Sequence, residues 1–250
     1  MASRRRLVAA ALASLAFAST AHAMGAPDCA PEELATVDAW LARHPWKAGA
    51  TSPEALVAAA CKLWPFDKSA LIVAAAYAQD KEHDKNLVVA LVDAKTMAVR
   101  AAFRGVVRED ATWSVAQGSL RIDTAPYDLA PGMRAFGVDV TSEPIAGTLV
   151  RDGVTASRSL FVADGPTLRL VLDGFVLTTW RQPAGAAAPT TTIAKIAIDP
   201  HRTGGLPDLR VTRTTTTAGA MKQDRTTLVY DGTRYGYGAG WQRHEVEPQP

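Results

Sequence analysis

The chain has 250 residues, with 27 lysines and arginines against 25 aspartates and glutamates. The first 23 residues hold three of the arginines and no acid, so the rest of the chain carries 24 basic residues against 25 acidic ones. A nearly neutral chain without a clustered basic face argues against a nucleic-acid partner. The remaining 227 residues, 250 less 23, suit one all-β domain or two small domains.

Residues 1–23 predict a secretory signal peptide. Three arginines at 4–6 form its basic segment, residues 7–17 are apolar, and Ala21-His22-Ala23 is a small-x-small cleavage site. A membrane span needs about 20 apolar residues, and no segment of the chain reaches that length. We therefore expect a periplasmic or secreted protein with no membrane span after cleavage. The arginines leave both the general and the twin-arginine export routes open.

Residues 24–68 predict a helical cap made of two helices. A proline and two acids at 31–33 are typical of the first turn of a helix. A second helix is predicted at 52–63, because Thr51 and Glu54 match a capping box. We expect this helical pair to cover one end or edge of a sheet.

The chain has two cysteines, Cys29 and Cys61. In an oxidising compartment a disulfide is the default expectation, and it would tie the start of the first helix to the end of the second. A redox or metal pair is the alternative, but 31 residues separate the cysteines and no His-Cys cluster lies nearby. We therefore expect a structural disulfide, no cofactor and no metal.

Residues 69–250 predict an antiparallel β domain. Runs rich in Val, Leu, Phe and Thr alternate with Asp-Gly pairs, which tolerate the backbone of tight hairpin turns. The Asp-Gly pairs lie at 152–153, 164–165, 173–174 and 231–232. The predicted strands lie at 70–78, 86–92, 97–107, 119–123, 134–141, 156–163, 167–172, 175–181, 191–198, 208–217 and 226–230.

A Pro/Ala/Gly-rich stretch at 182–190 interrupts this pattern. We interpret it as a long surface loop, because the residues after it hold about three strands, too few for an independent core. The predicted fold is therefore mainly β: an antiparallel β-sandwich or a partly open barrel with an N-terminal α-helical pair.

The loop from Asp199 to Gly205 is the most enzyme-like segment. It brings together an acid, the imidazole of His201, the guanidinium of Arg202 and two glycines. An ordinary turn whose backbone is set by proline and glycine is the alternative interpretation. No nucleophile elbow or zincin motif occurs, so the sequence predicts no catalytic residues and no metal ligands.

Aromatic residues gather near the C-terminus, where Tyr235, Tyr237 and Trp241 alternate with glycines. Glycine beside an aromatic residue can let the ring lie flat against a sugar, a peptide or a partner protein. A last hairpin that closes the core would produce the same pattern. We keep these three residues, with His201 and Arg202, as weak candidates for binding.

Two segments carry a resemblance to known sequences. They are Cys61-Lys62-Leu63-Trp64-Pro65, and Leu120-Arg121-Ile122-Asp123-Thr124-Ala125-Pro126-Tyr127-Asp128-Leu129 with Arg134-Ala135-Phe136-Gly137-Val138. Over about its middle half, the chain resembles a family of secreted or periplasmic bacterial proteins of unknown function. The resemblance implies export and a β-rich fold, and it carries over no catalytic residue.

The function predicted from the sequence is non-catalytic binding of another protein or of an envelope component. Catalysis usually needs a nucleophile or base held beside an orienting group, and the sequence displays no such constellation. The alternative is a periplasmic hydrolase that uses the loop from Asp199 to Gly205.

Overall fold

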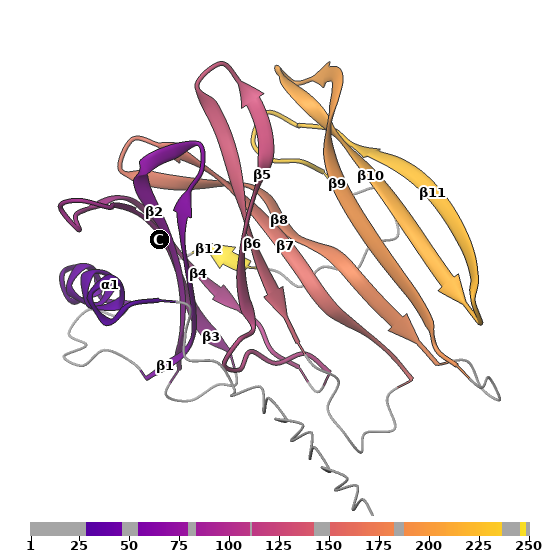
Figure 1. Cartoon of the computed structure of the whole chain (residues 1–250), viewed down its shortest axis with the longest axis horizontal. Helices are drawn as coiled ribbons and strands as arrows, with labels where there is room; N and C mark the ends of the chain where they lie inside the picture. The colour runs from indigo at the N-terminus through magenta and orange to yellow at the C-terminus, as the bar shows by residue number, and fades with distance from the viewer. Residues whose placement is uncertain are drawn as a thin grey trace, which may run out of the picture.

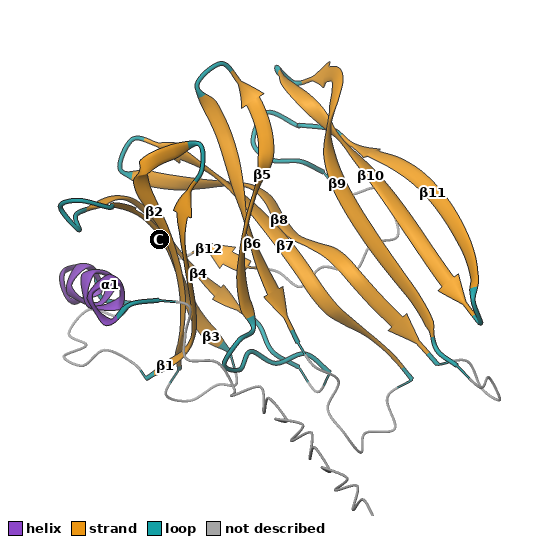
Figure 2. Cartoon of the chain, viewed as in Figure 1, coloured by secondary structure: helices purple, strands orange, loops and turns teal. Residues whose placement is uncertain are grey.

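The computed structural model describes residues 29–46, 55–79, 84–110, 112–142, 151–182, 188–236 and 246–248. These residues form one helix, α1 (Pro31–Arg43), and strands that belong to a single, mostly antiparallel sheet (Figure 2). The strands are β1 (Leu56–Trp64), β2 (Asp67–Ala78), β3 (Lys85–Asp93), β4 (Val99–Val107), β5 (Leu120–Ala130), β6 (Met133–Thr141), β7 (Asp152–Asp164), β8 (Thr167–Arg181), β9 (Thr190–Thr203), β10 (Leu206–Thr217), β11 (Ala220–Leu228) and β12 (Val246–Pro248). The predicted signal peptide, at 1–23, lies outside the described residues.

The sheet follows the order β1-β2-β3-β4-β8-β7-β6-β5. Its halves meet at one parallel pair, in which Ala102 of β4 lies opposite Thr167 of β8. The last four residues of β8 pair with β9, and β10 and β11 follow outward. β12 pairs with β4. The prediction of a mainly antiparallel β fold is thus confirmed as an open sheet.

The sheet curls so that its parts stack in layers. Figure 1 shows α1, then β1–β4, then β5–β8, and then β9–β11. Three clusters of buried apolar side chains fill the spaces between successive layers. We call them the helix core, the first sheet core and the second sheet core. None of the helices in the described part of the chain is long and apolar enough to cross a membrane.

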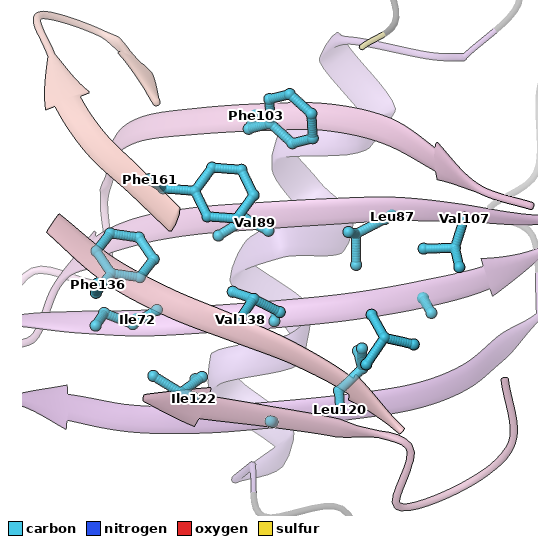
Figure 3. Close-up of a cluster of buried hydrophobic side chains, with 14 of the residues drawn as sticks. Ile72, Leu87, Val89, Phe103, Val107, Leu120, Ile122, Phe136, Val138 and Phe161 are labelled. Carbon is cyan, nitrogen blue, oxygen red and sulfur yellow. The ribbon is translucent and has the colours of Figure 1, made fainter. Parts of the chain in front are cut away.

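The first sheet core lies between β1–β4 and β5–β8 (Figure 3). Aromatic rings form its centre: the centroids of Phe103 and Phe161 are 5.1 Å apart, and those of Phe136 and Phe161 are 5.9 Å apart. Trp64 packs edge-on against Phe136 at 5.5 Å. Strands β1 and β5, at the two ends of the main strand order, approach each other here: Lys62 Nζ on β1 donates to the Ile122 carbonyl on β5 at 3.4 Å.

The apolar runs of β2 and β3 are explained by burial on both faces. Along β2, Leu71 and Val73 face the helix core, whereas Ile72 and Ala74 face the first sheet core. On the helix side, Tyr77 donates its hydroxyl to Asp38 Oδ1 of α1 at 2.8 Å. The sequence therefore shows a continuous apolar run in place of alternation.

The predicted second helix, at 52–63, is wrong over its described part, which is strand β1. Ala58 and Ala60 face the first sheet core and Ala59 faces the helix core, which is the two-residue period of a strand. Alanine favours helix in isolation, but pairing with β2 decides the conformation here. The described residues of the cap therefore contain one helix, and the predicted helical pair is not confirmed.

The predicted disulfide is confirmed, because Cys29 and Cys61 are bonded. Since residue 61 lies on β1, the bond ties the start of α1 to an edge strand of the sheet. It therefore links the helix layer to the sheet.

The four Asp-Gly pairs do not all form hairpin turns. Gly165 (φ +59°) lies in the turn between β7 and β8, and the pair at 231–232 lies in the turn closed by Tyr230 and Tyr235. Gly153, however, lies at the start of β7, and Gly174 lies within β8. Gly174 has a φ of +48° beside a register irregularity, so its backbone freedom serves a bulge.

Candidate binding site

The predicted enzyme-like loop is mostly the end of a strand. β9 continues to Thr203, and Gly204 and Gly205 alone make the turn to β10. Gly204 has a φ of +61°, and a Cβ at this position would lie 2.4 Å from the carbonyl oxygen of Tyr230. This turn therefore requires glycine for both its conformation and its close packing.

His201 and Thr203 bind the same carboxylate oxygen. His201 Nδ1 lies 2.5 Å from Asp208 Oδ2, and Thr203 Oγ1 donates to the same atom at 3.2 Å. The side chain of His201 is 74% exposed, whereas that of Asp208 is 3% exposed. Asp208 Oδ1 is buried without a hydrogen-bond partner among the described residues. The Thr203 hydroxyl therefore donates to the Asp208 carboxylate and not to the His201 imidazole.

The two charged groups shift each other's pKa. The hydrogen bond and the charge of Asp208 raise the pKa of His201 above its ordinary value. Burial acts to raise the pKa of Asp208, but the hydrogen bonds from His201 and Thr203 outweigh it and the net shift is downward. The pair is therefore a local ion pair at mildly acidic pH.

The other predicted binding residues do not gather around this pair. Arg202 is exposed and donates to the Gly205 carbonyl at 3.1 Å. Tyr235 is fully buried in the second sheet core, where its hydroxyl donates to the Pro207 carbonyl at 2.7 Å. Its backbone N–H donates to the Val171 carbonyl at 2.7 Å and so joins the last described turn to β8. Tyr237 and Trp241 lie outside the described residues.

A second candidate surface is the exposed face of β9–β11, which we call the outer face. Strand pairing sets its side chains in rows across the three strands. One row is Lys195, Thr212 and Arg225, and the next contains Arg210. The three cations are exposed. The remaining residues of the rows are Thr191, Ile193, Ala197, Thr214, Thr216, Met221, Gln223 and Thr227.

The outer face continues onto β8 through two further residues. Thr178 lies opposite Ile193, and Trp180 lies opposite Thr191. Trp180 is partly exposed, and its indole covers Gly153 of β7, where a Cβ would lie 3.2 Å from the indole Nε1. The missing side chain of Gly153 therefore lets the ring lie close to the sheet. The result is one exposed surface with an indole, several hydroxyls and three cations.

A buried ion network lies on β5–β7. Arg158 donates from Nε and Nη2 to both oxygens of Asp139 at 2.6 and 2.7 Å, and from Nη1 to the Tyr127 hydroxyl at 2.7 Å. Asp123 Oδ2 lies 2.5 Å from Arg158 Nη1 and accepts from Tyr127 at 2.8 Å. A Cβ on Gly137 would meet the Arg158 side chain at 3.2 Å, so glycine leaves room for it.

The electrostatics of this network are those of a structural ion cluster. Burial raises the pKa of the Tyr127 hydroxyl, so the phenol stays protonated and donates to Asp123. Burial opposes the charge on Arg158, but its hydrogen bonds to Asp139 and the charge of that carboxylate more than compensate and raise the pKa of Arg158. Each polar group in the cluster has its partner, and all four side chains are held in place.

Among the described residues, one group has the composition of a metal site: Cys29, Glu33 and Cys61. The two sulfurs are joined in the disulfide, and Glu33 Oε2 accepts a hydrogen bond from the Ala30 N–H at 2.8 Å. A thiolate is what binds a metal, so the oxidised pair offers none.

The sequence interpretation did not identify the outer face or the ion network. Two signals for an exposed strand face were visible in the sequence: the alternation of apolar and other residues at 191–197, and the threonines of 212–217. The pairing register that sets Lys195 beside Thr212 and Arg225 is a tertiary property. The same holds for Arg158, whose partners lie 19 and 31 residues away along the chain.

We compared the chain with known protein families, with curated proteins and with solved structures. None of these three comparisons found a match. The function is therefore inferred from the geometry of the residues described above.

Proposed function

We propose that the protein is an exported, non-catalytic binding protein that holds an acidic polysaccharide of the cell envelope on its outer face. The observation that carries this proposal is the row of Lys195, Thr212 and Arg225, with Arg210 in the neighbouring row. Two strand spacings separate Lys195 from Arg225, which is roughly 10 Å. This spacing suits successive acidic groups along an extended polymer.

The charge of the outer face favours an anion. Asp199 lies at the end of this face, where one oxygen is 3.5 Å from Arg210 Nη1. Asp224 of β11 is on the opposite face of the sheet, 3.2 Å from Arg213. Three cations against one described acid therefore give the outer face a net positive charge, and exposed cations of this kind attract and orient acidic ligands.

The other residues of the outer face favour a sugar polymer. Trp180 offers an indole to the apolar side of a sugar ring, and threonine hydroxyls can both donate and accept hydrogen bonds. An exposed array of side chains across β8–β11 can contact several units of a chain at once. A compact small ligand would instead need a concave site that surrounds it.

The geometry around His201 supports the non-catalytic part of the proposal. A hydrolase would need the Thr203 hydroxyl to donate to the imidazole, so that the base could take its proton. Here Thr203 and His201 both bind Asp208 Oδ2, which orders the end of β9 against β10. This arrangement serves the fold of the strand end and gives no activated nucleophile.

Export is supported by two features. The Cys29–Cys61 bond is of the kind that persists in an oxidising compartment. The predicted signal peptide at 1–23 has the basic, apolar and small-residue segments of a secretory leader. Both features support our proposal that the protein acts in the periplasm or outside the cell.

The test is a calorimetric titration of the protein with polygalacturonate and with the neutral polymer dextran. We expect binding of the acidic polymer that weakens as salt is raised, and much weaker binding of dextran. Lys195→Glu should reduce the affinity by about tenfold or more, since a charge-assisted contact becomes a repulsion. The matched control is Lys95→Glu, in the exposed turn between β3 and β4, which should bind normally.

Two results would contradict the proposal. Equal affinity for both polymers would show that charge does not determine binding. Unchanged binding by Lys195→Glu and Trp180→Ala would show that the ligand does not bind to the outer face. Polymer cleavage by the protein that is lost in a folded His201→Ala variant would favour the hydrolase hypothesis instead.

A further inference from the structure

Strand β11 lies at an edge of the sheet. It pairs with β10 over nine consecutive positions, from Leu228 opposite Leu209 to Ala220 opposite Thr217. No other strand among the described residues pairs with β11. In an antiparallel ladder alternate backbone groups point to each side, so about half of those in β11 point away from β10. This edge is regular and long enough to receive another strand.

The side chains of β11 form a pattern that complements itself. Lys222 and Asp224 are exposed, lie on the same face of the sheet and flank Gln223. If the same strand were placed antiparallel beside it, with Gln223 opposite Gln223, each Lys222 would lie opposite the Asp224 of the other strand. A two-fold axis at Gln223 would thus create two ion pairs.

The pairing could also be centred on another residue while the Lys222 faces of both copies still point to the same side of the joined sheet. Three of these registers are less favourable. An axis at Lys222 would put the two lysines opposite each other, and an axis at Asp224 would do the same with the two aspartates. An axis at Arg225 would oppose two arginines. Like charges directly opposite one another destabilise a strand pair, and among the same-face registers only the one centred on Gln223 places opposite charges directly opposite each other.

We propose that a second copy of this chain pairs antiparallel along β11, with the two-fold axis at Gln223. On the face of Lys222, Arg213 already lies 3.2 Å from Asp224 within one chain. The dimer adds Lys222 of the second copy on the other side of Asp224, so the charges alternate along the row. Charged edge strands usually resist pairing, but here the charges match those of the identical strand.

The outer faces of both copies would lie on the same side of the joined sheet. Arg225 of one copy would lie opposite Met221 of the other, so the exposed rows would continue across the axis. The interface rests on β11 alone and does not depend on the proposed ligand. In this register seven residues of each β11, 220–226, lie opposite β11 of the other copy. Because this is a small contact, we expect a dimer that dissociates on dilution.

The first test is a cross-link at the axis in the full chain. Residues directly opposite in an antiparallel pair have Cα atoms about 4.5–5.5 Å apart, within reach of a disulfide. Gln223→Cys should therefore give a covalent dimer on mild oxidation. The matched control is Thr227→Cys, also exposed on β11, whose two copies would be eight positions apart along the strands, or roughly 27 Å. It should give no covalent dimer, although the non-covalent dimer can still form.

The second test is a charge exchange followed by sedimentation equilibrium. Lys222→Glu and Asp224→Lys should each weaken the dimer by about tenfold or more, because each places like charges opposite one another. The double variant with Lys222→Asp and Asp224→Lys should restore association. Circular dichroism melting shows whether each variant is folded, and the cross-link test does not involve either charge.

The proposal is overturned by a chain that stays monomeric at high concentration and cross-links no better through residue 223 than through residue 227. It is equally overturned by a dimer that both single charge variants leave intact, since another surface would then hold it. Loss of the dimer in both single variants and its return in the double variant would support the register centred on Gln223.

Discussion

Strands β2 and β3 and strands β10 and β11 are both antiparallel pairs, but they differ in how many faces they bury. β2 and β3 lie between the helix core and the first sheet core, so both their faces are covered. β10 is covered on one face, and β11 is exposed over most of its length. The side chains of the first pair make their contacts within the fold, whereas the second pair has exposed side chains that can contact other molecules.

This difference follows from the composition of the strands. Alanine, valine, leucine and isoleucine dominate the buried run of β2, where a polar side chain would lose its water without gaining a partner. Threonine, lysine and arginine dominate β10 and β11. Threonine keeps the β-branched shape that favours strands and adds a hydroxyl. The exposed strands can thus fold as a sheet and still present a polar surface.

The sharpest test of this comparison is to shorten one buried side chain in the first sheet core and one exposed side chain on the outer face. Phe136 is fully buried in the first sheet core and contacts Trp64 and Phe161, so Phe136→Ala should lower the free energy of unfolding by about 3–5 kcal/mol. Ile193 on the outer face is 48% exposed, and Ile193→Ala should change it by at most about 0.5 kcal/mol. Urea denaturation measures both. Similar losses in the two variants would mean that both faces of β9 are buried in solution.

Buried ion pairs should likewise contribute more to stability than exposed ones. Arg158→Met should destabilise the protein by about 3–5 kcal/mol, because it leaves Asp139, which is 6% exposed, without its partner. The control is Arg134→Met, which removes a pair to Asp128, 56% exposed, and should cost about 1 kcal/mol or less. Thermal denaturation monitored by circular dichroism gives both values. A small loss for Arg158→Met would indicate that water reaches the network.

The disulfide should stabilise the helix side of the molecule. Replacing Cys29 and Cys61 together by serine should lower the free energy of unfolding by about 2–4 kcal/mol, since the bond closes a loop with a sequence separation of 32. Thiol titration of the denatured, unreduced protein should find no free thiol. Two free thiols would contradict the bond, and a double variant as stable as the parent would show that α1 is held by packing alone.

The smallest effect concerns pH and His201. Its pKa is raised from an ordinary value of 6.5, so its contribution to stability is fully present below pH 6.5 and is lost as pH rises through the raised pKa. The pKa of Asp208 is lowered from 3.8, so its contribution is present above pH 3.8 and is lost below it. The difference in stability between the parent and His201→Gln should therefore be largest between about pH 4 and 6.5. NMR titration should show Asp208→Asn returning the pKa of His201 toward 6.5. An unchanged pKa would exclude the pair.

The sequence was most informative where local chemistry decides the structure. The Cys29–Cys61 bond followed from the count of cysteines, and the turn at Gly165 followed from its Asp-Gly pair. It failed at 56–63, where alanines favour helix locally but lie beside β2 in the folded chain. The outer face was missed for the same reason, because strand register depends on contacts between distant segments.

The candidate residues illustrate the same limit. His201 was singled out for its chemistry, but only the fold shows that its ring and the Thr203 hydroxyl share one oxygen of Asp208. Tyr235 was singled out for its glycine neighbours, which fit an exposed ring and a buried ring equally well. Its hydrogen bond to Pro207 lies inside the second sheet core and depends on how β10 packs.

Strand β8 has a consequence for how the molecule unfolds. Its side chains enter both sheet cores, with Val176 in the first and Phe175 in the second. Disrupting either core exposes one side of the β7–β8 hairpin, on which the other core is built. The two sheet cores should therefore unfold as one cooperative unit, with amide protons of β7 and β8 exchanging only through global opening. Amide protons of β11, at the edge, should exchange through local opening long before.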